Sequence, residues 1–430
     1  RENNSTFLST AYDQNGVLDP SSTSDQLNVG TTNTDRITFQ SDMVVPQGDR
    51  DKLEFGVKFS LTERPSTSLV YDRDPDSGME VLDSALSNEL GITDNIHAAY
   101  GNWTHKFTDH WSMQAGLRLE ITRFTGEILG TGGSFSYEYP KDGKDLDKAL
   151  FPAVYLVRRW DDEGGRELQF NVSRKIQRPN FWQINPFISF RDNRNFRVGN
   201  PTLAPEISTL GEVSHLLPIG KGRSNWLSTV FTRYTDDVIT GYTTPSTEDS
   251  TLLISSYINA RDSWTAGWEN TVRIVTAKRM EITVSGTAQY TDLSTGIANA
   301  RNAGWSGEVK GMFLIRLPKD LAFQVNGEYE FPTIQAQGRS LANYTMDVSL
   351  SKDIGKRWSV VASVRDVFNQ RRWGSITETE TFISENSRRW EQRNGTVTLA
   401  WRFGERDASL FNRRKQGRTE PGLQDDGEGQ

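Results

Sequence analysis

Apolar and polar residues alternate along most of this chain, from about Arg36 to Phe403, and the gaps between the alternating runs are of two kinds. Short gaps alternate with long gaps along the chain. The short gaps are Pro46–Asp51, Phe107–His110, Asp161–Gly165, Pro218–Arg223, Thr276–Arg279, Pro318–Asp320 and Ser351–Lys356. The long gaps are roughly Asp72–Thr93, Glu127–Ala149, Pro179–Pro205, Gly241–Ser250, Asp292–Gly304, Pro332–Ser340 and Phe368–Arg388. Tight turns at one end and long loops at the other are typical of an outer-membrane β-barrel, whereas a soluble sandwich has no reason to sort its loops by end.

The alternation is clear within single runs. Trp111–Thr122 places Trp, Met, Ala, Leu and Ile on one face, and Ser, Gln, Gly, Arg and Glu on the other. A period of two separates the two faces of a strand, and the polar face here carries too much charge for a protein core but suits a wet lumen. The runs predict an all-β fold, a transmembrane antiparallel up-and-down barrel of about sixteen strands, from Ser5–Tyr12 to Thr396–Phe403.

Composition supports this interpretation and excludes others. Only 35% of the 430 residues are apolar and the mean hydropathy is −0.61, which a barrel tolerates because only every second strand residue faces lipid. No stretch approaches the roughly 18 apolar residues that a membrane helix needs. The net charge of −7 gives no support to nucleic-acid binding. Cysteine is absent, which removes disulfides and thiolate chemistry.

Aromatic residues and the chain ends add three expectations. Two aromatic belts are predicted at the membrane interfaces, one beside the short turns and one toward the long loops. Their members are Trp111, Trp226 and Trp358 in the first belt, and Tyr71, Phe124, Tyr290, Phe331 and Trp390 in the second.

Residues 1–403 are assigned to the barrel and the charged, Gly-rich residues 404–430 to a flexible periplasmic tail. The chain opens without a signal peptide, and since an outer-membrane protein must be exported, we expect a C-terminal piece of a longer chain.

The least ordinary segment lies between two predicted strands, from Ser173 to Glu206. Proline ends strand pairing there, and two Asn-Pro turns follow. With these residues the chain resembles the outer-membrane β-barrel family of TonB-dependent receptor-like proteins, whose "RI-RP…LNP…D…GNP-L-PE" block also joins two barrel strands. The matching residues are Arg178, Pro179, Asn185, Pro186, Gly199, Asn200, Pro201, Pro205 and Glu206. Weaker likenesses are Ala115–Glu120, Phe151-Pro152, Val364–Arg372 and the ending Trp401–Gly404.

The resemblance implies an architecture and a set of partners. Such receptors look like barrels of about 22 strands closed by an N-terminal plug with a TonB-contacting box, so the plug and the first strands would be missing from these residues. It also implies import of an unidentified ligand across the outer membrane of a Gram-negative bacterium. The implied partners are outer-membrane lipid, the barrel-assembly machinery through an assembly signal at Trp401 and Phe403, and TonB through the plug, with a surface lipoprotein left open.

Two charged loop segments are candidate ligand sites, and for each of them the alternative is that the charges are only solvated. Arginine forks suit phosphate or carboxylate, so a long external loop is a candidate ligand site with Arg191, Asp192, Arg194 and Arg197. A calcium loop is the second candidate, because carboxylates at Asp72, Asp74, Asp76, Glu80 and Asp83 have the right spacing. Ser77 stands where such loops favour glycine, which weakens the calcium hypothesis. No other metal site and no cofactor is predicted.

Enzymatic chemistry has little support. The chain has four histidines and shows no Ser-His-Asp order and no Gly-rich phosphate loop, so we predict that it is not an enzyme. An outer-membrane hydrolase would have to use His97 or His105 at the lipid-facing rim. The main alternative to an importer is a surface-binding or structural barrel without transport activity. The remaining alternative is a soluble all-β protein, such as a lectin or a propeller.

Overall fold

The computed structural model describes residues 2–12, 18–74, 77–84, 86–129, 133–141, 146–160, 165–190, 195–220, 223–276, 279–297, 300–355, 357–389 and 391–403. The predicted tail, residues 404–430, lies outside the described residues. No helix in the described part is long and apolar enough to span a membrane.

Nearly all regular structure is antiparallel strand. The strands in the first half are β1 (Glu2–Tyr12), β2 (Leu18–Thr32), β3 (Asp35–Gln47), β4 (Asp51–Arg73), β5 (Glu80–Leu82), β6 (Asn88–Lys106), β7 (Trp111–Ile128), β8 (Gly133–Tyr139), β9 (Leu150–Arg159), β10 (Glu167–Gln177), β11 (Ser189–Phe190), β12 (Asn195–Arg197) and β13 (Glu206–Ile219). Those in the second half are β14 (Ser224–Pro245), β15 (Leu253–Thr276), β16 (Met280–Ser294), β17 (Arg301–Leu317), β18 (Leu321–Glu330), β19 (Ile334–Gln335), β20 (Gly338–Ser340), β21 (Asn343–Ile354), β22 (Trp358–Arg365), β23 (Trp373–Glu378), β24 (Ile383–Arg388) and β25 (Asn394–Trp401). A short helix, α1 (Phe181–Ile184), lies between β10 and β11.

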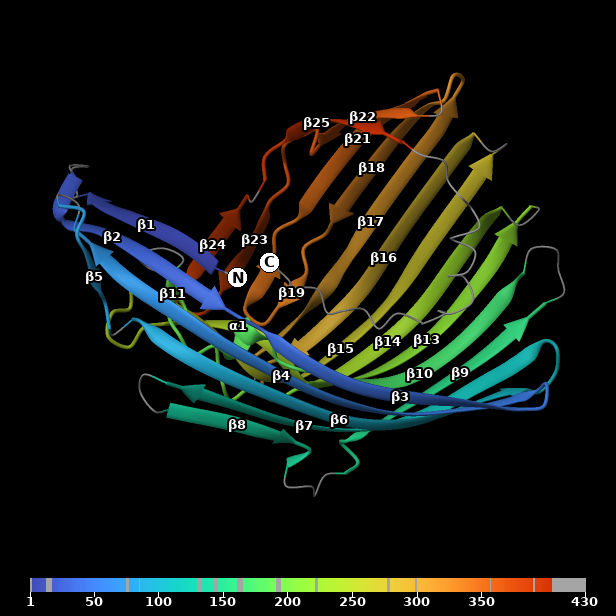
Figure 1. The fold of residues 1–430 in the computed structure, drawn as a ribbon, viewed down its shortest axis with the longest axis horizontal. Helices are drawn as coiled ribbons and strands as arrows, with labels where there is room; N and C mark the ends of the chain where they lie inside the picture. Colours follow the sequence, from blue (N-terminus) through green and yellow to red (C-terminus); the bar gives the residue numbers. More distant parts are fainter. Residues whose placement is uncertain are drawn as a thin grey trace.

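Each long strand pairs with the next one along the chain, and the wall of the sheet curves around an open interior (Figure 1). Within the described residues the sheet contains 21 strand segments. Some of them are halves of one run: β2 and β3 follow each other along β4, as β8 and β9 do along β7. Among the described residues, β25 does not pair with β1 or β3, so the sheet is not closed. The all-β, antiparallel prediction is confirmed, while about sixteen strands of an expected 22 or so, and a missing plug, stay predictions.

The period of two places opposite chemistries on the two faces of the wall. Leu117 on β7 pairs with Gly101 and is 48% exposed on the outward face, as expected for a lipid contact. Glu120, three residues later, points inward and is only 4% exposed. At the edge strand, Leu399 is 62% exposed. These outward apolar positions are not packed inside protein, which agrees with a membrane-facing wall.

Register also locates the aromatic belts. Trp358 stacks on Trp401 at the short-turn end, with ring centroids 5.7 Å apart. Tyr290 contacts Trp305 near the long loops at 5.7 Å. Phe124 was assigned to this second belt, and that assignment is wrong. It points inward and is only 5% exposed, because it packs on residues that fold into the interior.

Every predicted long gap contains some strand, including the gaps Gly241–Ser250 and Phe368–Arg388. Gly241 and the residues up to Pro245 continue β14, so half of the gap assigned to Gly241–Ser250 is strand. The gap assigned to Phe368–Arg388 holds β23 and β24, which form a second sheet of four strands with β19 and β20. Their alternation was hidden because these short strands expose both faces to water and carry polar residues on both.

The second sheet is fastened to the wall. Gln337, in the turn between β19 and β20, donates from Nε2 to the carbonyl of Thr243 at 2.9 Å and accepts from its N–H at 2.6 Å. Ala336 is buried against Ala260 and Leu293. The long loops therefore fold back over the inner face of β14–β16 instead of standing free.

Candidate functional site

A segment between β10 and β13 folds into the interior, and we call residues 178–206 the inner block. Its residues 191–194 lie outside the described part. Figure 1 shows α1, which belongs to this block, within the curve of the sheet. The block begins where Pro179 cannot continue the ladder of β10 and ends where β13 resumes at Glu206.

The entrance of the inner block is fixed by a buried ion pair. The guanidinium of Arg178 pairs with the carboxylate of Glu120 on β7 and donates to Thr122 Oγ1 at 2.7 and 3.0 Å. Arg118 donates from Nε to the other oxygen of Glu120 at 2.6 Å. Glu120 and Thr122 are almost fully buried, so they need these partners.

A turn of helix and a close backbone crossing shape the middle of the inner block. Asn180 and Gln183 form a capping box: Asn180 Oδ1 accepts from the N–H of Gln183, whose side chain accepts from the N–H of Asn180. Gly199 then crosses Asn185, and its N–H donates to the carbonyl of Asn185 at 2.8 Å. A Cβ at position 199 would lie 2.6 Å from Asn185 N, so only glycine fits.

The underside of the inner block is apolar. Its side chains join two strands of the wall in the main hydrophobic cluster of the described residues, with Tyr257 and Ile239 packed around it. The buried members are Leu90, Ile92, Phe124, Phe181, Ile184, Phe187 and Leu203. Burial of each large side chain contributes roughly 1.5–3 kcal/mol, so this cluster holds the block on the wall.

A polar clamp on β14 and β15 holds the other side of the inner block. The amide of Asn259 accepts from the N–H of Ala204 at 2.8 Å and donates to its carbonyl at 2.9 Å. It also donates to the carbonyl of Asp237 at 2.7 Å, at a bulge where Asp237 has φ +55°. Asn200 donates to the carbonyl of Tyr257 at 2.9 Å. The inner block is therefore attached to both β6–β7 and β14–β15.

The structure thus brings together most of the residues that the sequence singled out as a turn block. Arg178, Gly199 and Asn200 each make a specific contact, and Glu206 accepts from the N–H of Ile239 at 2.5 Å. Asn185 Oδ1 accepts from the N–H of Phe187 at 3.2 Å, and Pro205 is buried, while Pro186 and Pro201 lie in the connecting turns. Sequence reasoning missed Asn259 and Thr122. Neither stands in an unusual motif, since both are ordinary inward residues of long strands.

The arginine loop is described only in part. Arg191, Asp192 and Arg194 lie outside the described residues. Arg197 lies on β12, which pairs in parallel with β15, and its guanidinium is 5.0 Å from the ring centroid of Tyr257. A role in ligand binding stays a prediction for all four residues.

The calcium hypothesis also stays a prediction. Asp74 Oδ1 accepts from the N–H and hydroxyl of Ser77 at 2.7 and 2.8 Å, and Asp83 accepts from the N–H of Leu86 at 3.1 Å. Asp72 accepts from Gln26 at 3.0 Å. Asp76 lies outside the described residues, and among the described ones no three His, Asp or Glu side chains gather as metal ligands.

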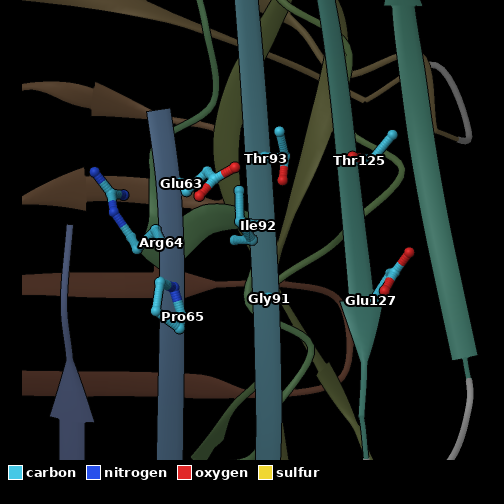
Figure 2. Close-up of a pocket in the computed structure, with 8 residues that line it drawn as sticks. All are labelled: Glu63, Arg64, Pro65, Gly91, Ile92, Thr93, Thr125 and Glu127. Atoms are coloured by element: carbon cyan, nitrogen blue, oxygen red, sulfur yellow. The ribbon is translucent and has the colours of Figure 1, made fainter. Parts of the chain in front are cut away.

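A shallow hollow of about 300 Å³ lies on the outward face, above the apolar band of β4, β6 and β7 (Figure 2). Register places Glu63 beside Thr93 and Thr125, and Glu127 beside Gly91. Figure 2 shows Arg64 turned away from these side chains, and its guanidinium is 5.5 Å from the ring centroid of Phe181 in the inner block. The hollow marks the level where the wall changes from apolar to polar.

The family of the chain follows from a match over almost its whole length. The model of the outer membrane protein beta-barrel family matches residues 1–401. The chain belongs to this family. It lies in the Gram-negative outer membrane, as the sequence predicted. No match was found among the curated proteins.

Solved structures share the fold. The ferric yersiniabactin uptake receptor FyuA from Yersinia pestis is 14% identical with a TM-score of 0.56, covering 94% of this chain and 58% of its own. The pyoverdine receptor FpvA from Pseudomonas aeruginosa PAO1 is 13% identical with a TM-score of 0.58, covering 94% and 58%. The copper transporter OprC is 11% identical with a TM-score of 0.57, covering 93% and 61%. This chain therefore spans about three fifths of the length of these receptors and transporters, none of which is named as an enzyme. The predicted resemblance to TonB-dependent receptors is confirmed.

Proposed function

We propose that this chain is the C-terminal barrel portion of a TonB-dependent receptor-like protein that imports a ligand across the outer membrane. The observation that carries the proposal is the inner block, which projects into the interior and is attached to the wall on both sides. A barrel that served only as an anchor would not need a polar inner face with such a segment docked on it. Proteins of the same fold are named for the uptake of ferric yersiniabactin and the transport of copper.

In this proposal the parts have separate tasks. The outward apolar residues hold the wall in lipid. The part of the inner block around Arg191, Asp192, Arg194 and Arg197 contacts the ligand, and the rest of the inner block narrows the path. Energy would come from TonB through a plug that these residues do not include. Trp401 and Phe403, exposed at the lipid-facing edge, would be read by the barrel-assembly machinery. A surface lipoprotein partner is compatible with these assignments, and no catalytic role is proposed.

The proposal is tested with the full-length protein in its own host. A deletion strain and a complemented strain are compared for uptake of ferric siderophores, ferric citrate, copper, cobalamin and labelled oligosaccharides, with and without depletion of TonB. We expect at least one compound whose uptake needs both the protein and TonB. If uptake of every compound is unchanged and the purified protein does not crosslink to the periplasmic domain of TonB, the surface-binding or structural alternative is favoured.

A further inference from the structure

A carboxylate at the short-turn end of β4 and β6 has one oxygen without a hydrogen-bond donor. Asp51 begins β4 and shares the outward face with Leu53, two residues further along the strand. Its Oδ1 accepts from Nε1 of Trp103 at 2.9 Å and from Nδ1 of His105 at 2.7 Å. Its Oδ2 accepts no hydrogen bond among the described residues, and the residues around it on β3, β4 and β6 are all described.

The same carboxylate has no permanent cation beside it. No Lys or Arg side chain among the described residues lies within ion-pair distance of Asp51, so the one basic group in contact with it is His105. A neutral imidazole donates from Nδ1 in one of its two tautomers, so this hydrogen bond needs no charge on the ring. The side chain of Asp51 is 30% exposed. A cation that reaches it from outside therefore finds an open, negatively charged oxygen.

Aromatic rings stand in a row beside this carboxylate. The ring centroids of Trp103 and His105 are 5.4 Å apart, and those of His105 and Phe107 are 4.7 Å apart. Trp103 and Phe107 are both exposed on the outward side. Aromatic rings attract cations to their faces, and amphipathic rings mark the level where lipid headgroups meet the protein. An ammonium group at this level can contact the carboxylate and a ring together.

An apolar hollow of about 310 Å³ adjoins the carboxylate on the side nearer the membrane centre. Leu53 and Trp103 pair with each other and form its lower border, one outward row above Asp51. Its floor is at Gly101, which has no side chain to fill the space, whereas its strand partners on both sides are large outward residues. The hollow therefore offers an apolar surface to an acyl chain whose headgroup lies at Asp51.

The chemistry of this place selects a primary ammonium group attached to an acyl chain. An ammonium donates charge-assisted hydrogen bonds, and an ionised carboxylate can only accept them. We name Asp51, Trp103, His105 and Phe107 the acidic belt site. We propose that it binds the ammonium group of phosphatidylethanolamine in the periplasmic leaflet of the outer membrane, with a chain of the same lipid in the hollow, independently of ligand uptake.

The direct test measures lipid binding to the full-length protein in detergent by native mass spectrometry. Phosphatidylethanolamine is titrated into the wild type and into D51N, which keeps the shape of the side chain and loses its charge. We expect D51N to bind this lipid about tenfold more weakly, because a hydrogen bond to a charged group is lost. Phosphatidylcholine, whose ammonium cannot donate, should bind the wild type more weakly than phosphatidylethanolamine. Phosphatidylglycerol, which has no ammonium, should bind both proteins alike.

Asp42 provides a matched control. It lies on the neighbouring strand β3 and accepts from the hydroxyl of Tyr100 at 2.6 Å, but it is next to the outward Met43 and therefore faces inward. D42N removes the same charge and should bind phosphatidylethanolamine like the wild type.

A115L tests the hollow and keeps the proposal testable if D51N does not fold. Ala115 pairs with Trp103 and lines the hollow, so a leucine there fills the space and leaves the carboxylate unchanged. A115L should bind phosphatidylethanolamine several-fold more weakly than the wild type.

Three results would overturn the proposal. Equal binding of phosphatidylethanolamine by the wild type and D51N would mean that the carboxylate serves only to hold Trp103 and His105 in place. An equal loss in D42N would mean that net charge alone is responsible. A loss in D51N that is as large for phosphatidylglycerol as for phosphatidylethanolamine would mean that the site does not recognise an ammonium group.

Discussion

Replacement of Asn259 by alanine should release the inner block from β15 without disturbing the wall. The side chain makes three hydrogen bonds, to the N–H and the carbonyl of Ala204 and to the carbonyl of Asp237. Each is worth about 1 kcal/mol net, so their loss weakens docking by about 3 kcal/mol. Since about 1.4 kcal/mol corresponds to a factor of ten, opening of the block should become roughly a hundred times more frequent.

Hydrogen exchange of the full-length protein in detergent measures this directly. Peptides covering residues 195–206 should exchange about a hundredfold faster in N259A, while peptides from β16 and β17 should not change. N259D keeps the acceptor for Ala204 N–H but sets a carboxylate oxygen against the carbonyls of Ala204 and Asp237, so exchange should be at least as fast as in N259A. The control is N270A on the same strand, whose side chain faces outward and accepts from Trp226 Nε1 at 3.0 Å. Unchanged exchange in N259A, or an equal rise along the whole wall, would refute the role of this clamp.

Three further substitutions test other contacts. R178M leaves a nearly buried carboxylate with one cationic partner fewer and should destabilise the folded protein by about 3 kcal/mol, seen as a lower unfolding midpoint in urea; an unchanged midpoint would contradict this. L117K puts a charge on the lipid face and should cost about 2–4 kcal/mol and reduce membrane insertion, whereas the inward Q114K should insert normally. G199A forces a Cβ onto backbone atoms and should increase proteolysis within the inner block, while G241A, with open space around it, should not. Equal digestion of both glycine variants would count against the close crossing.

The sequence predicts the wall well because lipid and water impose opposite chemistries on alternate residues. The hairpin expected from Arg36 to Leu61 appears as β3 and β4, with the turn after Pro46 where it was placed. The ends of the strands could not be predicted from the sequence where both faces of the sheet contact water, because the alternation of apolar and polar residues is lost there. This is why β14 continues through Gly241 and why β23 and β24 were taken for loop.

The sequence predicts which residues form the candidate site but does not predict that the segment folds into the interior. Its prolines and glycines mark a departure from strand pairing, and they say nothing about the direction in which the segment folds. The inward direction is decided by partners far away in the chain, such as Glu120 and Asn259, whose inward side chains look like any other lumen residue in the sequence. Phe124 was misplaced for the same reason, because its ring is buried in the cluster that contains Phe181 and does not lie at the membrane interface.

The attachment of one short segment to two distant parts of the wall has a kinetic consequence. Hairpins such as β3–β4 can zip together locally, because their paired residues are neighbours in sequence. The segment with Phe181 and Ala204 cannot settle until Leu90 on one side and Asn259 on the other have both reached their final positions. It should therefore be among the last pieces to acquire protection during refolding, and its ordering reports that the strands on both sides have been assembled.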